Sequence, residues 1–160
     1  MSSLIDTAVL GFGLVYYAFL CLVFVLRAYM RQEELLLKYV FSLLLLPCII
    51  LFGLNILSNQ PYRAITLAPL LVFLVYDLWY RAITEKKPLH HPEKWPRELV
   101  IYVLLLYGGS IGLNWYGYLV SKQYGHILVA GFFATMASYT LYQTKHNKRK
   151  KRETINILYD

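Results

Sequence analysis

Residues 81–98, RAITEKKPLHHPEKWPRE, form the one long polar and charged stretch that lies between apolar runs on both sides. Five of these eighteen residues are Lys or Arg. Short loops that are rich in Lys and Arg stay on the cytoplasmic side of a membrane. The stretch therefore predicts a cytoplasmic loop on the membrane surface, and its location fixes the orientation of every other predicted span.

The composition is typical of a polytopic membrane protein. Of the 160 residues, 58% are hydrophobic and 16% are charged, which leaves too little polar surface to cover a soluble core of this size. The formal net charge of +7 is concentrated in loops and a tail beside apolar runs, where anionic lipid headgroups are the nearest partner. We therefore expect anionic lipids as partners and no nucleic acid.

Five segments are long and apolar enough to cross about 30 Å of hydrocarbon as helices. We predict an all-α polytopic membrane protein with five transmembrane helices at about 7–26, 39–57, 64–80, 99–120 and 124–142. Residues 1–142 are expected to form a single transmembrane bundle, and residues 143–160 a basic cytoplasmic tail. The third segment is the weakest, because Pro69 lies within its first two turns and Asp77 in its last.

The distribution of positive charge gives the orientation. With five spans and the N-terminus outside, 14 of the 16 Lys and Arg residues lie on the cytoplasmic side, as expected for a single orientation. A four-span arrangement without the third segment places Arg27, Arg31 and Lys38 of the first loop on the side opposite the basic loop, which gives a weaker asymmetry. The chain has no Asn-x-Ser/Thr glycosylation motif, and we expect a bacterial or archaeal plasma membrane.

Small and amide side chains in the last two predicted spans indicate helix packing. In lipid, helices associate through close contact of small residues and a few hydrogen bonds, not through the hydrophobic effect. The sequence leaves two interpretations open: packing of the two spans against each other, or a docking face for a partner chain. The predicted packing residues are Gly108, Gly112, Asn114, Ala130, Ala134 and Ser138.

Candidate chemistry is sparse. His90, His91 and Glu93 are ligand types suited to a transition metal, but consecutive His residues in a Pro-flanked loop rarely point at one ion, so they are weak metal candidates. Asp77 is the only carboxylate inside a predicted span, one turn before Arg81, and an interfacial ion pair is the expected arrangement. We predict no catalytic residue and no cofactor.

The most specific surface feature is a run of five basic residues in the tail. Each basic residue near an anionic leaflet contributes about 1 kcal/mol of attraction, so the run predicts contact with lipid headgroups or with an acidic surface of a partner. The run consists of Lys148, Arg149, Lys150, Lys151 and Arg152.

These patterns lead us to expect a small accessory subunit of a larger integral membrane complex, non-catalytic by itself, whose partners are other integral membrane subunits. We expect an oxidoreductase or respiratory-type assembly, for example a membrane monooxygenase, because small helical subunits are common there. One alternative is a stand-alone transporter or channel whose path uses the helices broken at Pro47 and Pro69, with Asp77 and Asn114 lining it. A second is a membrane enzyme that acts on lipid or quinone through the His90, His91 and Glu93 loop.

Overall fold

The computed structural model describes residues 2–29, 34–79 and 97–159, and all three ranges are helical apart from two short connections. The predicted all-α class is confirmed. The helices are α1 (Ser2–Tyr29), α2 (Glu34–Leu57), α3 (Pro61–Leu78), α4 (Arg97–Val120) and α5 (Lys122–Tyr159).

Three of these helices are long and apolar enough to cross a membrane: Leu4–Leu26 in α1, Pro61–Leu78 in α3 and Val100–Val120 in α4. Their 18 to 23 residues rise about 27 to 35 Å, which matches the thickness of the hydrocarbon core. The helix α2 contributes a shorter apolar stretch, Leu43–Leu57. The lengths and the apolar composition of these helices are consistent with integration into a membrane.

The third helix begins earlier than the sequence predicted. Pro61 occupies the first turn of α3, where a missing N–H costs no hydrogen bond, so the helix starts three residues before the expected boundary. The connection from α2 is short, and Asn59 takes the left-handed conformation with φ of 55°. Asn tolerates this conformation better than most residues do, so the chain reverses direction within a few residues.

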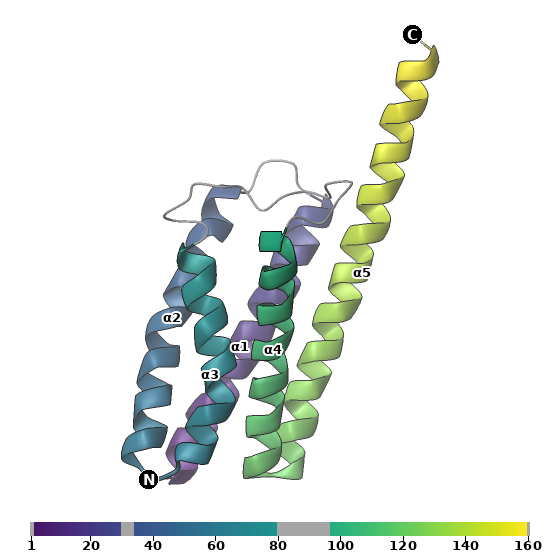
Figure 1. The fold of residues 1–160 in the computed structure, drawn as a ribbon. Coiled ribbons are helices and arrows are strands. Elements are labelled where there is room, and N and C mark those ends of the chain that lie inside the picture. The colour runs from purple at the N-terminus through teal and green to yellow at the C-terminus, as the bar shows by residue number, and fades with distance from the viewer. Residues whose placement is uncertain (1, 30–33, 80–96, 160) are drawn as a thin grey trace.

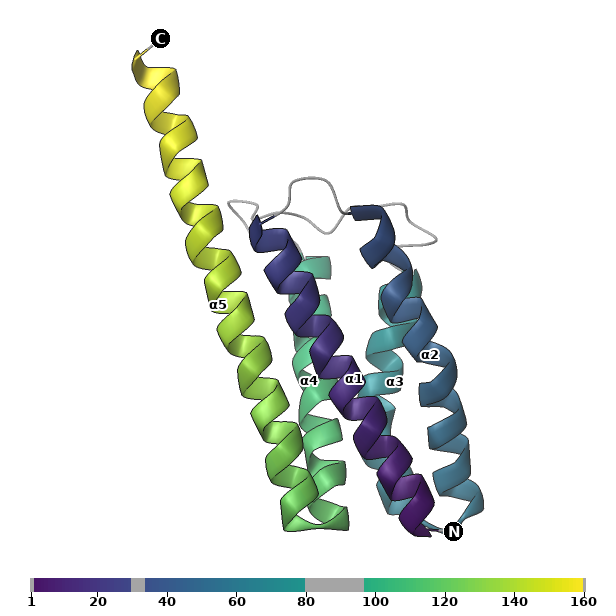
Figure 2. The same ribbon diagram turned by 180° about the vertical axis from the view of Figure 1, so that it is seen from behind.

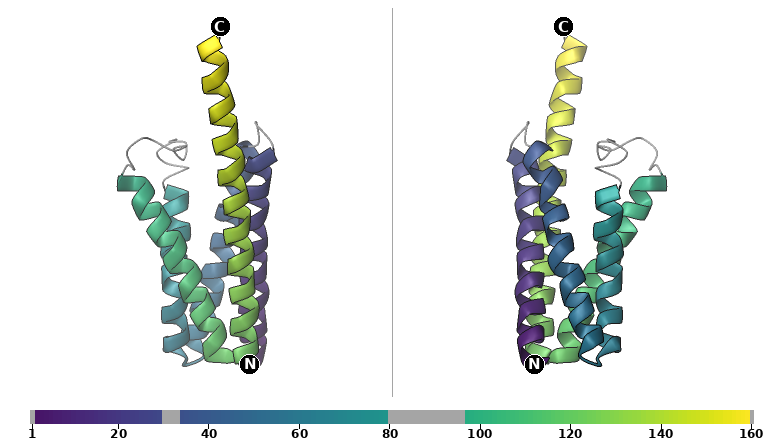
Figure 3. Two further views of the ribbon diagram at one scale, coloured as in Figure 1. Left: turned by 90° about the vertical axis from the view of Figure 1, so that its right-hand side faces the viewer. Right: turned by 90° about the vertical axis from the view of Figure 1, so that its left-hand side faces the viewer.

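The helices are arranged as a ring in which each contacts the next, in the order α1, α5, α4, α3, α2 and back to α1. The most extensive contacts are those of α3 with α4 and of α1 with α5. Figures 1 and 2 show that the N-terminus and the two short connections lie at one end of the bundle, which we call the base. Figure 3 shows the α3–α4 pair and the α1–α5 pair close together at the base and diverging toward the opposite, far end.

The core is apolar and is drawn from every helix. Its most deeply buried members include Val9 of α1, Leu70 and Phe73 of α3, Leu113 of α4 and Leu128 of α5. Many large apolar side chains also point outward on all five helices. An outer surface of this kind suits lipid or another apolar subunit and does not suit water.

Glycines set the closest helix contacts. A methyl group added to Gly112 of α4 would lie 2.2 Å from the carbonyl oxygen of Thr66 in α3. One turn earlier, a methyl group added to Gly108 would meet nothing within 4 Å. The approach of α4 to α3 therefore depends on the absence of a side chain at Gly112 and does not depend on Gly108.

This difference gives a matched pair of substitutions. We expect Gly112→Ala to lower the thermal stability of the detergent-solubilised protein, because the methyl group must push α3 away from α4 at a cost of about 1–3 kcal/mol. Gly108→Ala is the control, since it adds a better helix former in open space and should leave the melting temperature unchanged or raise it. Equal melting temperatures for the two variants would contradict the close contact.

Candidate functional site

The interior of the bundle holds two clusters of polar side chains. The first, at the base, is the base cluster of Asp6, Asn55, Arg63 and Tyr116, one residue from each of the first four helices. Asp6 Oδ1 accepts a hydrogen bond from Arg63 Nη1 at 2.5 Å and one from the Tyr116 hydroxyl at 3.0 Å. Asn55 Oδ1 lies 3.1 Å from the same hydroxyl, and its amide nitrogen donates to the Leu51 carbonyl. Because a hydroxyl has one proton, Tyr116 serves one acceptor at a time.

Local structure explains the position of the ion pair. Asp6 lies in the second turn of α1, which begins at Ser2. Arg63 lies in the first turn of α3, where the dipole disfavours a positive charge, and the Asp6 carboxylate offsets this cost. The two side chains are only 10% and 13% exposed, so the pair is largely withdrawn from solvent.

The second cluster, the central cluster, lies between α1 and α4 and consists of Tyr16, Tyr17, Ser110 and Asn114. The Tyr17 hydroxyl lies 2.8 Å from Asn114 Oδ1 and 3.1 Å from the Ser110 carbonyl oxygen, and it can donate to either. The ring of Tyr17 lies against Gly131 of α5, which leaves room for it. The Tyr16 hydroxyl is fully buried and lies near the Ser110 side chain.

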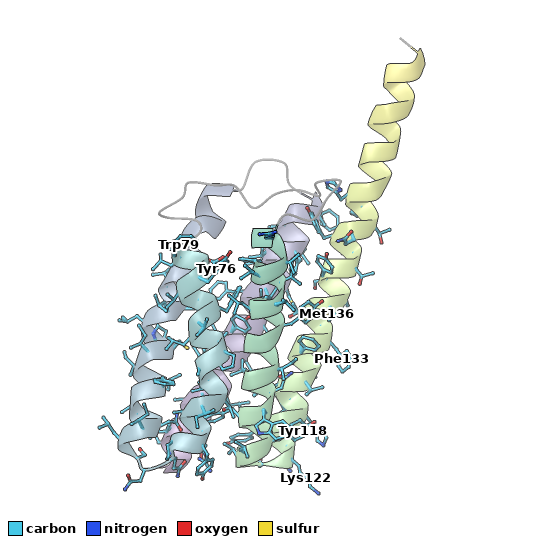
Figure 4. The ribbon with its side chains drawn as sticks, viewed as in Figure 1. Tyr76, Trp79, Tyr118, Lys122, Phe133 and Met136 are labelled. Carbon is cyan, nitrogen blue, oxygen red and sulfur yellow. The ribbon has the colours of Figure 1, made fainter. Side chains whose placement is uncertain are left out.

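Asp77 of α3 is fully buried, with no exposed surface. The carboxylate therefore faces the interior of the bundle. Arg81, its expected partner, lies outside the described residues. Tyr76 and Trp79 lie beside it near the far end of α3, with ring centroids 6.0 Å apart, and Figure 4 shows both at that end of the bundle.

The predicted packing residues fall into two groups. Gly112 lies against α3, and Asn114 accepts its hydrogen bond from α1, so both face other helices of the same chain. Ala130 and Ala134 of α5 are exposed, while half-buried Ser138 donates a hydrogen bond to the Ala134 carbonyl of its own helix. Figure 4 shows Phe133, 64% exposed, on the outer side of the same helix. The small-residue face of α5 therefore lies on the surface of the bundle.

The other predicted site residues lie within residues 80–96 or near the C-terminal end of α5. His90, His91 and Glu93 fall within 80–96, outside the described residues. Within the described ranges, no group of three His, Cys, Asp or Glu side chains could hold a metal ion. The basic run 148–152 lies on α5, which continues without a break from the bundle to Tyr159. The predicted tail, residues 143–160, is therefore helical as far as Tyr159 and forms the C-terminal part of α5.

The base cluster was missed by the sequence analysis, although one signal for it exists. Asp6 and Arg63 have opposite charges and lie near the starts of the first and third predicted helices, which run in the same direction. Side chains at those two positions reach the same end of a bundle. The sequence does not show that the two helices lie close enough to pair, since α1 and α3 are connected through α2.

Comparison with known proteins gives no relative: no protein-family model, no curated protein and no solved structure matches the chain.

The base cluster generates a test by double-mutant cycle. We expect Asp6→Asn and Arg63→Gln each to lower the free energy of unfolding in detergent, because each leaves the other charge in a site with little water. The double variant should lose less than the two single losses together, with a coupling free energy of roughly 1–3 kcal/mol. The control is Lys122→Gln, an exposed cation at the same end of the bundle. Additive losses would show that the pair is not coupled.

Proposed function

We propose that the chain is a small helical subunit of a larger integral membrane complex and that it contributes a docking surface, not a reaction. In this proposal all five helices cross the membrane, with the N-terminus outside and the C-terminus in the cytoplasm. The strong asymmetry of Lys and Arg between the two sides supports this orientation. The membrane we propose is a bacterial or archaeal plasma membrane, and the assembly is of the oxidoreductase or respiratory type.

The observation that carries the proposal is the exposed small-residue face of α5. Ala130, Ala134 and Ala137 lie along one side of the helix and are all exposed. Elsewhere in the chain, small residues are used where two helices come close, as at Gly117 of α4, which lies against Gly125 of α5. A face that only meets lipid gains nothing from small side chains, whereas a face that meets another helix gains close backbone contact.

The face also has neighbours suited to an interface between membrane subunits. Phe133 is exposed beside the alanines, and its ring lies 6.0 Å from that of Phe132. Phe132 in turn contacts Tyr107 of α4, with ring centroids 6.2 Å apart. A partner helix placed on the alanines would therefore have an aromatic side chain at its edge, and aromatic residues are enriched at protein interfaces.

The proposal predicts that a larger side chain on this face prevents the partner from binding. We expect Ala134→Leu to abolish co-migration of the chain with larger subunits on a native gel after gentle detergent extraction, because the added side chain prevents close backbone approach. Ala18→Leu is the matched control: Ala18 is also exposed, but it lies on α1. It should leave the complex intact in the same fixed ratio. A wild-type chain that runs alone or as a homo-oligomer would overturn the proposal.

Transport is a second candidate, favoured by the complete burial of Asp77. An acidic side chain in the interior of a membrane bundle is costly and is often part of a proton or ion pathway. Asp77 lies on α3, toward the end where α3 and α4 diverge from α1 and α5 (Figure 3).

This candidate is tested in proteoliposomes with an imposed pH gradient and a pH-sensitive dye inside. Transport predicts that the wild-type chain accelerates proton flux and that Asp77→Asn abolishes the acceleration while the helical content stays unchanged. Flux equal to that of protein-free vesicles, or a fully active Asp77→Asn variant, counts against it.

A further inference from the structure

The far end of the bundle has a well-defined rim on the α1–α5 side. Tyr29 is the last residue of α1, and the Lys145 ammonium of α5 lies over its ring, 3.2 Å from the centroid. The neighbouring His146 lies beside Tyr142, with ring centroids 5.8 Å apart. Lys145 is therefore level with the end of α1, and it is held there by a cation–π contact.

Beyond this rim α5 continues past the other helices that the structure describes. Its last thirteen helical residues, 147–159, form what we call the arm. Figures 1 and 3 show the arm extending past the ends of the other four helices. At 1.5 Å per residue, the helix carries the basic run about 5 to 11 Å beyond Lys145 and its C-terminal residue Tyr159 about 21 Å beyond it.

The arm has no position at which it could bend sharply toward a membrane surface. Sharp kinks occur at Pro, at Gly or at a π-bulge, and the last glycine of α5 is Gly131, well inside the bundle. From that residue to Tyr159 the helix contains no proline and is α-helical throughout. The arm therefore keeps the axis of the bundle part of α5.

The sequence of the arm also differs from that of a helix that lies on lipid. Such helices carry an apolar stripe along their whole length. In the arm, residues 147–154 are all polar, and the apolar residues are confined to the end: Ile155, Ile157, Leu158 and Tyr159. Attraction of basic residues to anionic headgroups decays within a Debye length of about 8 Å at physiological salt. A straight arm thus places Lys151, Arg152 and the apolar end more than this distance beyond Lys145, while Lys148, Arg149 and Lys150 lie within it.

We propose that the arm is a docking element for an acidic protein surface on the cytoplasmic side, an inference that rests on the membrane orientation and the subunit role proposed above. Carboxylates on the partner would face the basic run, which provides five positive charges within five residues. An apolar depression beside them would take the end of the arm, where positions 155, 158 and 159 share one face of the helix. The partner is thus an Asp- and Glu-rich surface with a small apolar centre, and not a lipid headgroup.

The position of the arm is tested with the full chain in lipid vesicles. A donor fluorophore is attached at position 160 and an acceptor dye to the lipid headgroups. We expect the same energy transfer in neutral vesicles and in vesicles rich in phosphatidylglycerol.

Asn147→Pro is the matched control, because it keeps every charge but breaks the helix at the rim. Its transfer should rise in the anionic vesicles as the run settles on the headgroups. An equal rise for the wild-type chain would show that the arm lies on the membrane and would overturn the inference.

Recognition of acidic surfaces is tested in the same anionic vesicles with a labelled, glutamate-rich peptide as the probe. The wild-type chain should bind the peptide, and replacement of all five basic residues of the run by Gln should weaken binding by about tenfold or more. Asn147→Pro should also weaken binding, since headgroups then compete for the run. Equal binding by the wild-type chain and the Gln variant, or by the wild-type chain and Asn147→Pro, would overturn the inference.

Co-migration on native gels separates the two proposals. If Ala134→Leu dissociates the complex while the Gln variant of the arm co-migrates in the wild-type ratio at raised salt, the docking inference fails and the subunit proposal stands. If neither variant changes the complex, both fail. The expected result is that the Gln variant loses the partner at a lower salt concentration than the wild-type chain does.

Discussion

One carboxylate oxygen, Asp6 Oδ1, ties together three helices of the bundle. It accepts hydrogen bonds from Arg63 of α3 and from Tyr116 of α4, and it belongs to α1. The Tyr116 hydroxyl extends the same network to Asn55 of α2. In a lipid environment, where apolar side chains gain nothing by leaving lipid for one another, such a node specifies which helices meet and in what register. The base of the bundle is therefore the end at which the arrangement is fixed.

The far end is organised differently, because the α3–α4 pair and the α1–α5 pair diverge toward it (Figure 3). Close packing at Gly112 holds α3 to α4, and Gly131 allows Tyr17 of α1 to lie against α5. Each pair is thus joined by its own glycine contact, while the base cluster connects the pairs at one end and the hydrogen bond from Tyr17 to Asn114 connects them farther along. This division allows the bundle to be rigid within each pair without requiring that all five helices stay parallel.

Sequence patterns predicted the helical class and the approximate position of each helix, because the length of an apolar run is a local property of the chain. They did not predict the start of α3, where Pro61 acts as a favourable first residue. They also did not predict which helix each packing residue meets. Spacing shows that Gly108 and Gly112 share a face, but only the arrangement in space shows that Gly112 meets Thr66 and that Gly108 meets nothing. The pairing of Asp6 with Arg63 was missed for the same reason, since 57 residues separate them.

The two sides of the helix α5 have different surroundings. Its inner side is committed to the bundle through Gly125, Leu128 and Gly131, which lie against α4 and α1. Its outer side presents alanines that are exposed in the described part of the chain. Because α5 is one continuous rod, displacement of the arm by a partner would be transmitted to the alanine face and to the Tyr17 contact without an intervening hinge. A partner bound to both the alanine face and the arm would therefore be oriented by a single rigid helix. Binding at one of the two contacts would position the partner for the other.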